Sequence, residues 1–507
     1  MLIVGLLTNN YIFVGEDTNE EQTTMYKPDK HLHYLLIGIA GILIFLPGIF
    51  SFFNSDDFVW LRNSQKISFE SISHFAVNYN PVLKFRPFTH LLFQFLYAIF
   101  QLNPLGYHIA SLFLHIINAL IFYALLLKFT SESKLSLFAS LIFVSHFAQE
   151  ETVLWISALS SPLVTFFYLC SIWALWEYLE NKKLRLYFLS FVLSSLALLS
   201  KEDGTTIFLV VFLLTALKSS GGLTSKIKRG ILLSSPFFGL TVLYSIIRYL
   251  TVPEAIMSKF LTLNPVVVIK NLCYFGISFL FPVRLFFDLV GFKVHSYLNN
   301  IIQFRLNNSW IILIVSVISL GFLSLIIHFL RKRIPGFKLG LVLILIGILP
   351  YLLVNGNGQR FLYFSCLGFS LALASLLIFF LERVNKLRFL NLLITGILIF
   401  NGLVLYERAV WWRKAGKVCQ EVIHQTGKII ILSPQDSEIY FANLPQRING
   451  AYTFHIGFEE AISIFYPESR DRVFDLGQFK EDELEALKGK YKGDIYIFKA
   501  KGFEKVF

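Results

Sequence analysis

Apolar residues along this chain gather in long runs that short polar segments separate. A run of roughly 20 apolar residues is long enough to cross the hydrocarbon core of a bilayer. Five runs reach about that length without a charge: 34–53, 107–127, 152–176, 309–330 and 361–381. Six further runs are shorter or less uniform: 135–148, 186–200, 204–217, 230–247, 337–354 and 389–406. The pattern predicts an α-helical polytopic membrane protein with about eleven transmembrane helices.

Basic residues concentrate in every second connection between these runs. The basic connections hold Lys128 and Lys134; Lys182, Lys183 and Arg185; Lys218, Lys226, Lys228 and Arg229; Arg331, Lys332, Arg333 and Lys338; and Arg383, Lys386 and Arg388. The short connections between them are acidic or sparse in charge. Because cytoplasmic loops carry an excess of Lys and Arg, this alternation predicts a cytoplasmic N-terminus and supports an odd number of crossings.

Composition agrees with a chain that lipid surrounds, since 55% of the residues are hydrophobic and only 15% are charged. A formal net charge of +12 is typical of nucleic-acid binders, but the short inner loops account for it here, so no nucleic-acid partner is expected. Four widely spaced cysteines, Cys170, Cys273, Cys366 and Cys419, indicate neither a disulfide framework nor a metal cluster.

The segments outside the runs differ in character. Residues 1–33 read as an N-terminal segment in which Met25 is a candidate for the natural start of translation. The transmembrane region then covers 34–406, with two long outer loops at 54–106 and 248–308. Both loops are rich in aromatic residues, and 90–100 is apolar but too short to span, which predicts helices lying in the membrane interface.

The last hundred residues, 407–507, have the composition of a small α/β domain outside the membrane. Strands are predicted at 428–432, 438–443 and 494–499, and helices at 458–465 and 482–487.

Two adjacent carboxylates, Asp56 and Asp57, directly follow the first run. Charges at a membrane boundary are commonly solvated end-markers, and the pair alone fits that interpretation. Beside interfacial aromatics, however, desolvation and mutual repulsion would raise one pKa and leave a carboxylate suited to accepting a proton. Metal binding by the pair stays open, because no clear third ligand accompanies it.

Two more acidic groups fall at outer connections, namely Glu150 and Glu151, preceded by His146, and Glu202 and Asp203. Acidic residues near helix N-termini are ordinary helix-end charges in the simplest interpretation. Their recurrence on one side of the membrane instead favours a single polar cavity there, which the chain would line with all three groups.

Cations on the same predicted face are Arg86, Lys201, Arg248 and Arg360. Arg matches phosphate oxygens bidentately, so these side chains would suit a lipid-linked phosphate. For any single one of them, snorkelling to lipid headgroups is an equally good explanation. Arg360 and then Lys201 are the strongest candidates.

Five short motifs together resemble a known family. They are Asp56-Asp57-Phe58, Phe85-Arg86-Pro87-Phe88-Thr89-His90, Leu102-Asn103-Pro104-Leu105-Gly106-Tyr107-His108, Ser200-Lys201-Glu202-Asp203-Gly204 and Gln359-Arg360-Phe361-Leu362-Tyr363. In this order and at these loop positions, they are similar to the GT-C class of membrane glycosyltransferases, nearest to its protein O-mannosyltransferase-like branch. The resemblance covers about residues 34–410.

The resemblance implies inverting transfer of a sugar from a polyprenyl-phosphate donor to an acceptor hydroxyl, at the outer face of a bacterial cytoplasmic membrane. It implies that Asp56 is the base, with Asp57 as its acidic neighbour and Glu151 as an acidic residue of the second outer loop. Lys201 and Arg360 would face the donor phosphate. The resemblance does not imply a particular cofactor, and it leaves open whether a divalent cation takes part. The acceptor is a protein, lipid or glycan.

The chain departs from that family in two places. Phe147-Ala148 follows His146 where relatives often have proline, and tetratricopeptide repeats are missing. The C-terminal module instead resembles the tails of uncharacterised bacterial relatives. A transporter or flippase of lipid-linked sugars is the alternative, although such proteins usually carry polar residues near the bilayer midplane and repeated halves. A scaffold that merely anchors the C-terminal domain is a third interpretation.

Overall fold

The computed structural model describes residues 30–65, 85–251, 264–282, 334–356, 358–479, 493–499 and 502–506, with single positions at 262, 329, 332, 483 and 491. The chain divides into two compact units. The helical unit contains Met1–Ile44, Leu112–Thr152 and Ser160–Leu405, and the mixed unit contains Phe45–Ser111, Val153–Leu159 and Tyr406–Phe507.

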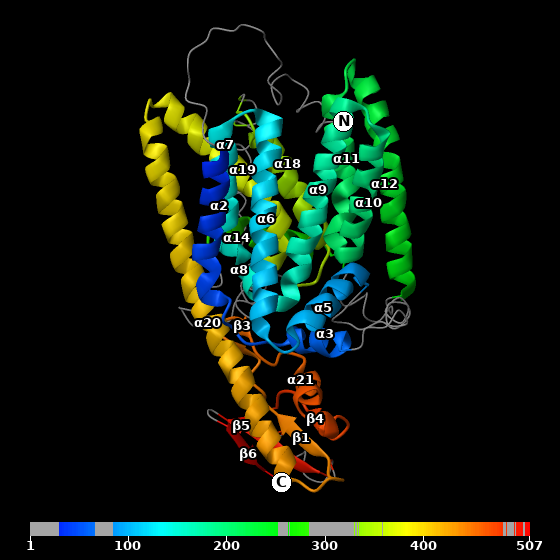
Figure 1. Ribbon diagram of the computed structural model, residues 1–507, viewed down its shortest axis with the longest axis vertical. Helices are drawn as coiled ribbons and strands as arrows, with labels where there is room; N and C mark the ends of the chain where they lie inside the picture. The colour runs from blue at the N-terminus through cyan, green and yellow to red at the C-terminus, as the bar shows by residue number, and fades with distance from the viewer. Residues whose placement is uncertain are drawn as a thin grey trace, which may run out of the picture. The chain divides into compact units, whose positions relative to one another are not determined.

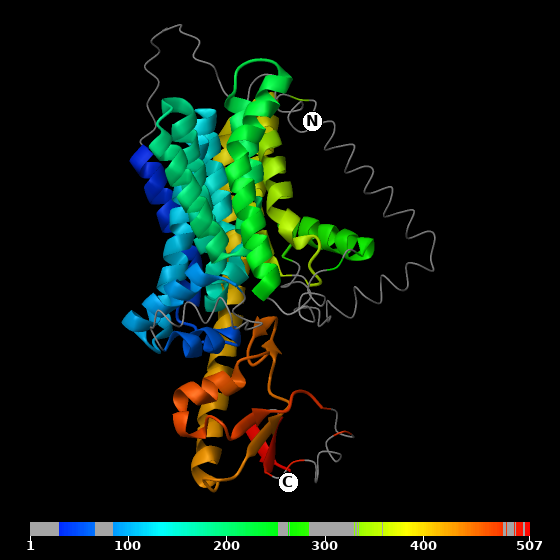
Figure 2. The ribbon, with the colours of Figure 1, turned by 90° about the vertical axis from the view of Figure 1, so that its right-hand side faces the viewer.

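Apolar helices that run side by side make up most of the helical unit (Figure 1). In the described ranges they are α2 (Lys30–Phe45), α6 (Pro104–Thr130), α7 (Ser133–Ser145), α8 (Glu150–Leu154), α9 (Ser160–Asn181), α10 (Leu184–Ser200), α11 (Ile207–Lys218), α12 (Leu223–Thr251), α14 (Pro265–Leu280), α18 (Phe337–Ile348), α19 (Tyr363–Arg383) and α20 (Leu390–Leu432). Figure 2 shows α14 lying across the direction of the other helices.

Among the described residues, six helical segments are long and apolar enough to cross a membrane, judged by length and composition: Lys30–Gly48, Pro104–Thr130, Ile156–Asn181, Leu223–Thr251, Gln359–Arg383 and Leu387–Leu432. Shorter apolar helices accompany them. Ten of the eleven predicted runs coincide with helices, and the run at 309–330 lies almost entirely outside the described residues. The prediction of an α-helical, multi-pass integral membrane protein is therefore confirmed.

Close helix packing in this unit depends on small residues. Where α18 crosses α19, a Cβ built on Gly340 would lie 2.6 Å from the carbonyl oxygen of Gly368, and one built on Gly368 would lie 2.5 Å from that of Gly340. Both distances are far shorter than real Cβ contacts, so the two backbones approach this closely only because neither residue has a side chain.

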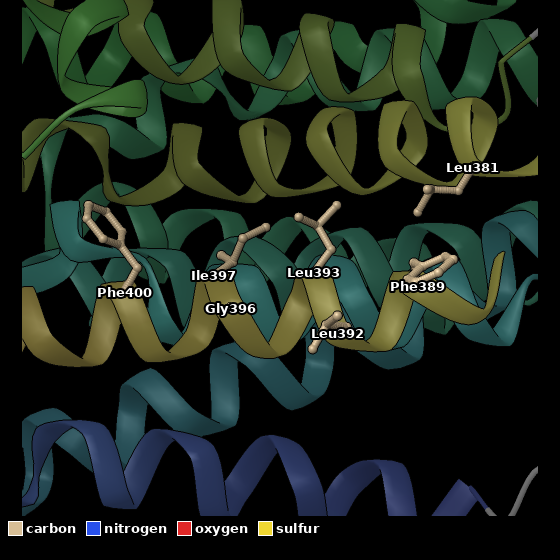
Figure 3. Close-up of a pocket in the computed structure, with 7 residues that line it drawn as sticks. All are labelled: Leu381, Phe389, Leu392, Leu393, Gly396, Ile397 and Phe400. Atoms are coloured by element: carbon tan, nitrogen blue, oxygen red, sulfur yellow. The ribbon is translucent and has the colours of Figure 1, made fainter. Parts of the chain in front are cut away.

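An apolar groove of about 540 Å³ lies between α19 and the first turns of α20. Leu381 borders it from α19, while Phe389, Leu393 and Ile397 point toward α19 from the other side (Figure 3). Every lining residue is apolar or glycine, as expected for a surface that lipid chains solvate.

The mixed unit combines short helices with a small sheet. In its described residues the elements are α3 (Asp56–Ser64), α5 (Pro87–Phe100), the part of α20 from Tyr406 onward, β1 (Ile439–Ala442), β2 (Arg447–Ile448), β3 (Ala451–Tyr452), α21 (Phe458–Phe465), β4 (Val473–Asp475), β5 (Asp494–Lys499) and β6 (Gly502–Lys505). The four-stranded sheet has the order β4-β1-β5-β6, in which β1 is parallel to both neighbours and β5 and β6 form an antiparallel hairpin.

The sequence pattern explains the strand positions. All four residues of β1 are buried, as expected for a central parallel strand that is covered on both faces. Strands β2 and β3 pair around Asn449 and Gly450, which have φ angles of 44° and 82°. An Asn-Gly pair with positive φ at both positions is the favoured two-residue hairpin turn.

Three of the five elements predicted in the last hundred residues are confirmed: 438–443 contains β1, 494–499 is β5 and 458–465 is α21. The helix predicted at 482–487 lies outside the described residues except for position 483. The strand predicted at 428–432 is wrong, because these residues form the last turns of α20. Their β-branched side chains favour a strand only weakly, and a helix already 38 residues long extends through them one hydrogen bond at a time.

Candidate functional site

Asp56 and Asp57 form the first turn of α3 in the mixed unit. Asp57 is buried, whereas Asp56 is partly exposed. The Asp57 carboxylate accepts three hydrogen bonds: from the Asn54 backbone N–H at 2.9 Å, the Ser157 N–H at 2.8 Å and the Ser157 hydroxyl at 2.5 Å. Asp57 therefore ties the start of α3 to the 3-10 turn Ile156–Leu159.

Burial raises the pKa of Asp57 from 3.8 to about 7, although the hydrogen bonds from Ser157 and Asn54 act in the opposite direction. Asp56 has a different environment, in which one carboxylate oxygen lies 3.1 Å from the Ser55 hydroxyl that donates to it. Of the two predicted carboxylates, Asp57 is thus the anchor of the turn, and Asp56 is the more exposed one.

Glu151 and Arg360 meet in the helical unit. Glu151 lies in α8 and is fully buried. Its Oε2 accepts a hydrogen bond of 3.1 Å from the Arg360 backbone N–H, and its Oε1 lies 3.5 Å from the Arg360 guanidinium. The Arg360 side chain remains 27% exposed. One buried carboxylate therefore holds both the backbone and the head group of a partly exposed cation.

Lys201 lies next to this pair and is almost completely buried. Its ammonium donates to the Ser161 hydroxyl at 2.7 Å and lies 3.4 Å from Asp203. The Tyr351 hydroxyl also donates to Asp203.

The ring of Phe361 lies between the two cations, 5.9 Å from the Lys201 ammonium and 4.8 Å from the Arg360 guanidinium. The two ion pairs Glu151–Arg360 and Lys201–Asp203 are thus neighbours, and we call these four residues the charged cluster.

The remaining predicted residues have varied surroundings. Arg248 lies 3.3 Å from Glu202 and donates to the Tyr244 hydroxyl. Glu150 is buried beside Glu151 in the first turn of α8. Arg86 is partly exposed at the N-terminal boundary of α5, in the mixed unit with Asp56 and Asp57.

His146 is buried, and its ring nitrogens are both engaged. The Ala148 N–H donates to Nδ1 at 3.2 Å, and Nε2 lies 3.1 Å from the Phe279 carbonyl oxygen. Since Nδ1 accepts, the ring is neutral and Nε2–H donates to that carbonyl. This histidine fixes the turn before α8.

Sequence reasoning missed three residues that shape these groups, namely Asn54, Ser157 and Tyr351. A serine or tyrosine in an apolar run carries no signal of its own, and Ser157 is 100 positions away from the carboxylate that it binds. Within the described ranges, no group of three or more His, Cys, Asp or Glu side chains is arranged to hold a metal ion.

Comparisons with known proteins found a likeness among solved structures. No family model and no curated protein sequence matches the chain. Among solved structures, the crystal structure of ArnT from Cupriavidus metallidurans bound to undecaprenyl phosphate is similar with a TM-score of 0.46 and 11% sequence identity. The match covers 92% of this chain and 93% of that one. Neither value is high enough to assign a function, so the function of this chain is inferred from its own residues.

Proposed function

We propose that this chain is a membrane glycosyltransferase of the GT-C class, which transfers a sugar from a polyprenyl-phosphate donor to an acceptor hydroxyl. The observation that carries the proposal is the turn at the start of α3, where the buried, triply hydrogen-bonded Asp57 holds the partly exposed Asp56 in place. A rigidly supported and accessible carboxylate is what general-base catalysis requires.

In this proposal Asp56 removes the proton of the acceptor hydroxyl. The acceptor oxygen forms a bond to the anomeric carbon while the bond from that carbon to the donor phosphate oxygen breaks. One displacement on the opposite face inverts the anomeric centre. The products are the glycosylated acceptor, a protonated Asp56 and the free polyprenyl phosphate, so no nucleotide or redox partner is needed.

In this proposal the charged cluster binds the donor phosphate. Arg360 is its partly exposed member, and guanidinium matches phosphate oxygens bidentately as negative charge develops on the leaving group. Lys201 is buried beside Phe361 and is paired with Asp203, so in this proposal it supports the cluster from within. Glu151 contacts Arg360 and is therefore a positioning residue for it.

The rival proposal is a flippase that moves lipid-linked sugars across the bilayer. Ion pairs in the described spans gather at helix ends, as with Lys128 on Glu177 and Glu180, near the last turns of α6 and α9. The buried His115, Asn118 and Tyr363 form a hydrogen-bonded polar group within the spans, a feature that a flippase would also use. The ion pairs at helix ends favour the transferase, because transporters usually place polar or broken-helix residues near the bilayer midplane.

A transfer assay tests the proposal. Purified chain in proteoliposomes would receive radiolabelled polyprenyl-phosphate hexoses and pentoses, with membranes of a strain lacking the chain as the source of acceptors. Asp56→Asn should lower transfer by roughly 10²-fold or more, the usual contribution of a general base. Asp436→Asn, at an exposed position of the mixed unit, is the matched control and should transfer normally.

A fully active Asp56→Asn protein with normal insertion would refute the assignment of the base. If no labelled sugar is transferred and the vesicles instead move intact donor across the bilayer, the flippase proposal replaces this one.

A further inference from the structure

A segment near the C-terminus, residues 452–460, packs directly on the turn that carries Asp56. The Asn54 amide donates to the Tyr452 carbonyl oxygen at 2.9 Å, and the Ile456 N–H donates to the Ser55 hydroxyl at 3.4 Å. The rings of Phe58 and Phe454 stack with centroids 5.8 Å apart. These contacts involve the residues immediately before and after the two carboxylates, so the segment forms one side of the turn.

Gly457 makes the closest approach. Its φ angle is +88°, a left-handed conformation that favours glycine. A Cβ at this position would lie 2.4 Å from the carbonyl oxygen of Ser55, which accepts the hydrogen bond of the Phe58 N–H in the first turn of α3. Any side chain here must displace that carbonyl, and with it the turn that presents Asp56.

Glu460 follows on α21, which packs against α3. Its side chain is partly buried, and burial is the largest cause of its raised pKa. The carboxylates of Glu459 and Asp56 raise it further, while the guanidinium of Arg62 lowers it. Asp56 and Arg62 of α3 therefore both act electrostatically on Glu460 of α21, and Asp56 also acts on its neighbour Asp57.

We infer that the 452–460 segment belongs to the proposed site, with Gly457 and Glu460 as positioning residues for Asp56. Gly457 sets where the carboxylate points, and Glu460 lies on the helix that packs against α3. The inference rests on the proposed function for its catalytic consequence, whereas the packing that it describes is testable without any sugar transfer. It gives the C-terminal region a direct role at the site.

The catalytic test uses Glu460→Gln, which keeps size and hydrogen bonding but removes the charge. Because like charges disfavour each other's ionisation, Asp56 should lose its proton at lower pH in this variant. The acidic limb of the pH–rate profile should therefore move to lower pH. Glu468→Gln, at an exposed position after α21, should leave the profile unchanged.

The packing test compares two glycines with the same backbone strain. Gly477 has a φ of +87° but nothing within 4 Å of a built Cβ, so Gly477→Ala controls for the strain in Gly457→Ala. In an Asp56→Cys, Cys273→Ser background, a membrane-impermeant maleimide would label the thiol at position 56. Gly457→Ala should change the labelling rate severalfold, and Gly477→Ala should not.

The outcomes separate the two proposals. Suppose that the unaltered chain transfers sugar, that Glu460→Gln has the same pH–rate profile as Glu468→Gln, and that Gly457→Ala is labelled as fast as Gly477→Ala. The inference is then overturned. If the unaltered chain transfers nothing, the proposed function fails, and the labelling rates alone still decide whether this segment positions the turn.

Discussion

At the scale of single residues, the sequence singled out candidate side chains without indicating which groups they contact. The adjacency of Asp56 and Asp57 singled out the pair, but their division into an accessible carboxylate and a buried anchor depends on Ser157, far away along the chain. Likewise, Glu151 and Arg360 are 209 positions apart and show no periodicity that would link them. Contacts of this kind arise from tertiary packing, which no local pattern encodes.

Asp57 makes stability depend on pH in a defined direction. Its folded-state pKa, about 7, is above the ordinary value of 3.8, so the folded chain holds this proton more tightly than the unfolded chain does. The resulting stabilisation is complete below about pH 4 and is lost as pH rises through 7. Between pH 5 and pH 8 the loss is of the order of 2–3 kcal/mol.

Asp57→Asn removes this titration. The unfolding temperature of the unaltered chain, followed by tryptophan fluorescence in detergent, should therefore decline relative to that of Asp57→Asn as pH rises from 5 to 8. A difference between the two that stays constant over this range would show that Asp57 titrates normally.

Glu151→Gln tests how Arg360 is held. The amide oxygen of glutamine can still accept the Arg360 backbone N–H, so the loop should keep its path. The charge that attracts the guanidinium is lost, and a less ordered Arg360 should bind the donor phosphate more weakly. We expect KM for the polyprenyl-phosphate sugar to rise severalfold with a smaller change in kcat. Arg388→Gln, which removes an exposed cation before α20, serves as the control for a general change of charge. An unchanged KM in Glu151→Gln would exclude the positioning role of Glu151.

At the scale of elements, hydrophobic runs predicted the helices well because lipid leaves the backbone little alternative to a helix. The same reasoning predicted β1, β5 and α21 from alternation and spacing. It failed at 428–432, where a local run of isoleucines competes with a helix that is already formed. The close crossing of α18 and α19 was also not predicted, since a glycine in an apolar run does not reveal its partner.

Gly368→Ala should disrupt that crossing, because its Cβ would meet the Gly340 carbonyl oxygen at 2.5 Å and backbone atoms cannot move aside as a side chain can. Overpacking of this kind typically costs about 1–3 kcal/mol. Gly396→Ala is a matched control in the neighbouring helix, where nothing lies within 4 Å of the built Cβ (Figure 3). Thermal unfolding in detergent should show a lower midpoint for Gly368→Ala only, and equal midpoints for both variants would mean that the helices do not cross at these glycines.

At the scale of the whole molecule, charge distribution and hydropathy together identified a membrane protein, whereas the net charge alone would have suggested a nucleic-acid binder. The alternation of basic loops also predicts an orientation in the membrane, with a cytoplasmic N-terminus. What no pattern supplied is the identity of the sugar and its acceptor, because a carboxylate and a guanidinium serve many donors and acceptors equally well.

The chemistry of the proposed reaction still predicts what a cell without this chain should contain. A transferase consumes a lipid-linked sugar and releases free polyprenyl phosphate, so its loss should raise the level of one polyprenyl-phosphate sugar and remove that sugar from one class of envelope glycan, lipid or protein. Mass spectrometry of extracted lipids and released glycans would identify both. Restoring the unaltered chain or Asp436→Asn should reverse the change, and Asp56→Asn should not, because it inserts normally but has lost its base. A strain in which Asp56→Asn restores the glycan would instead place the chemistry in another protein and leave this one with transport or anchoring.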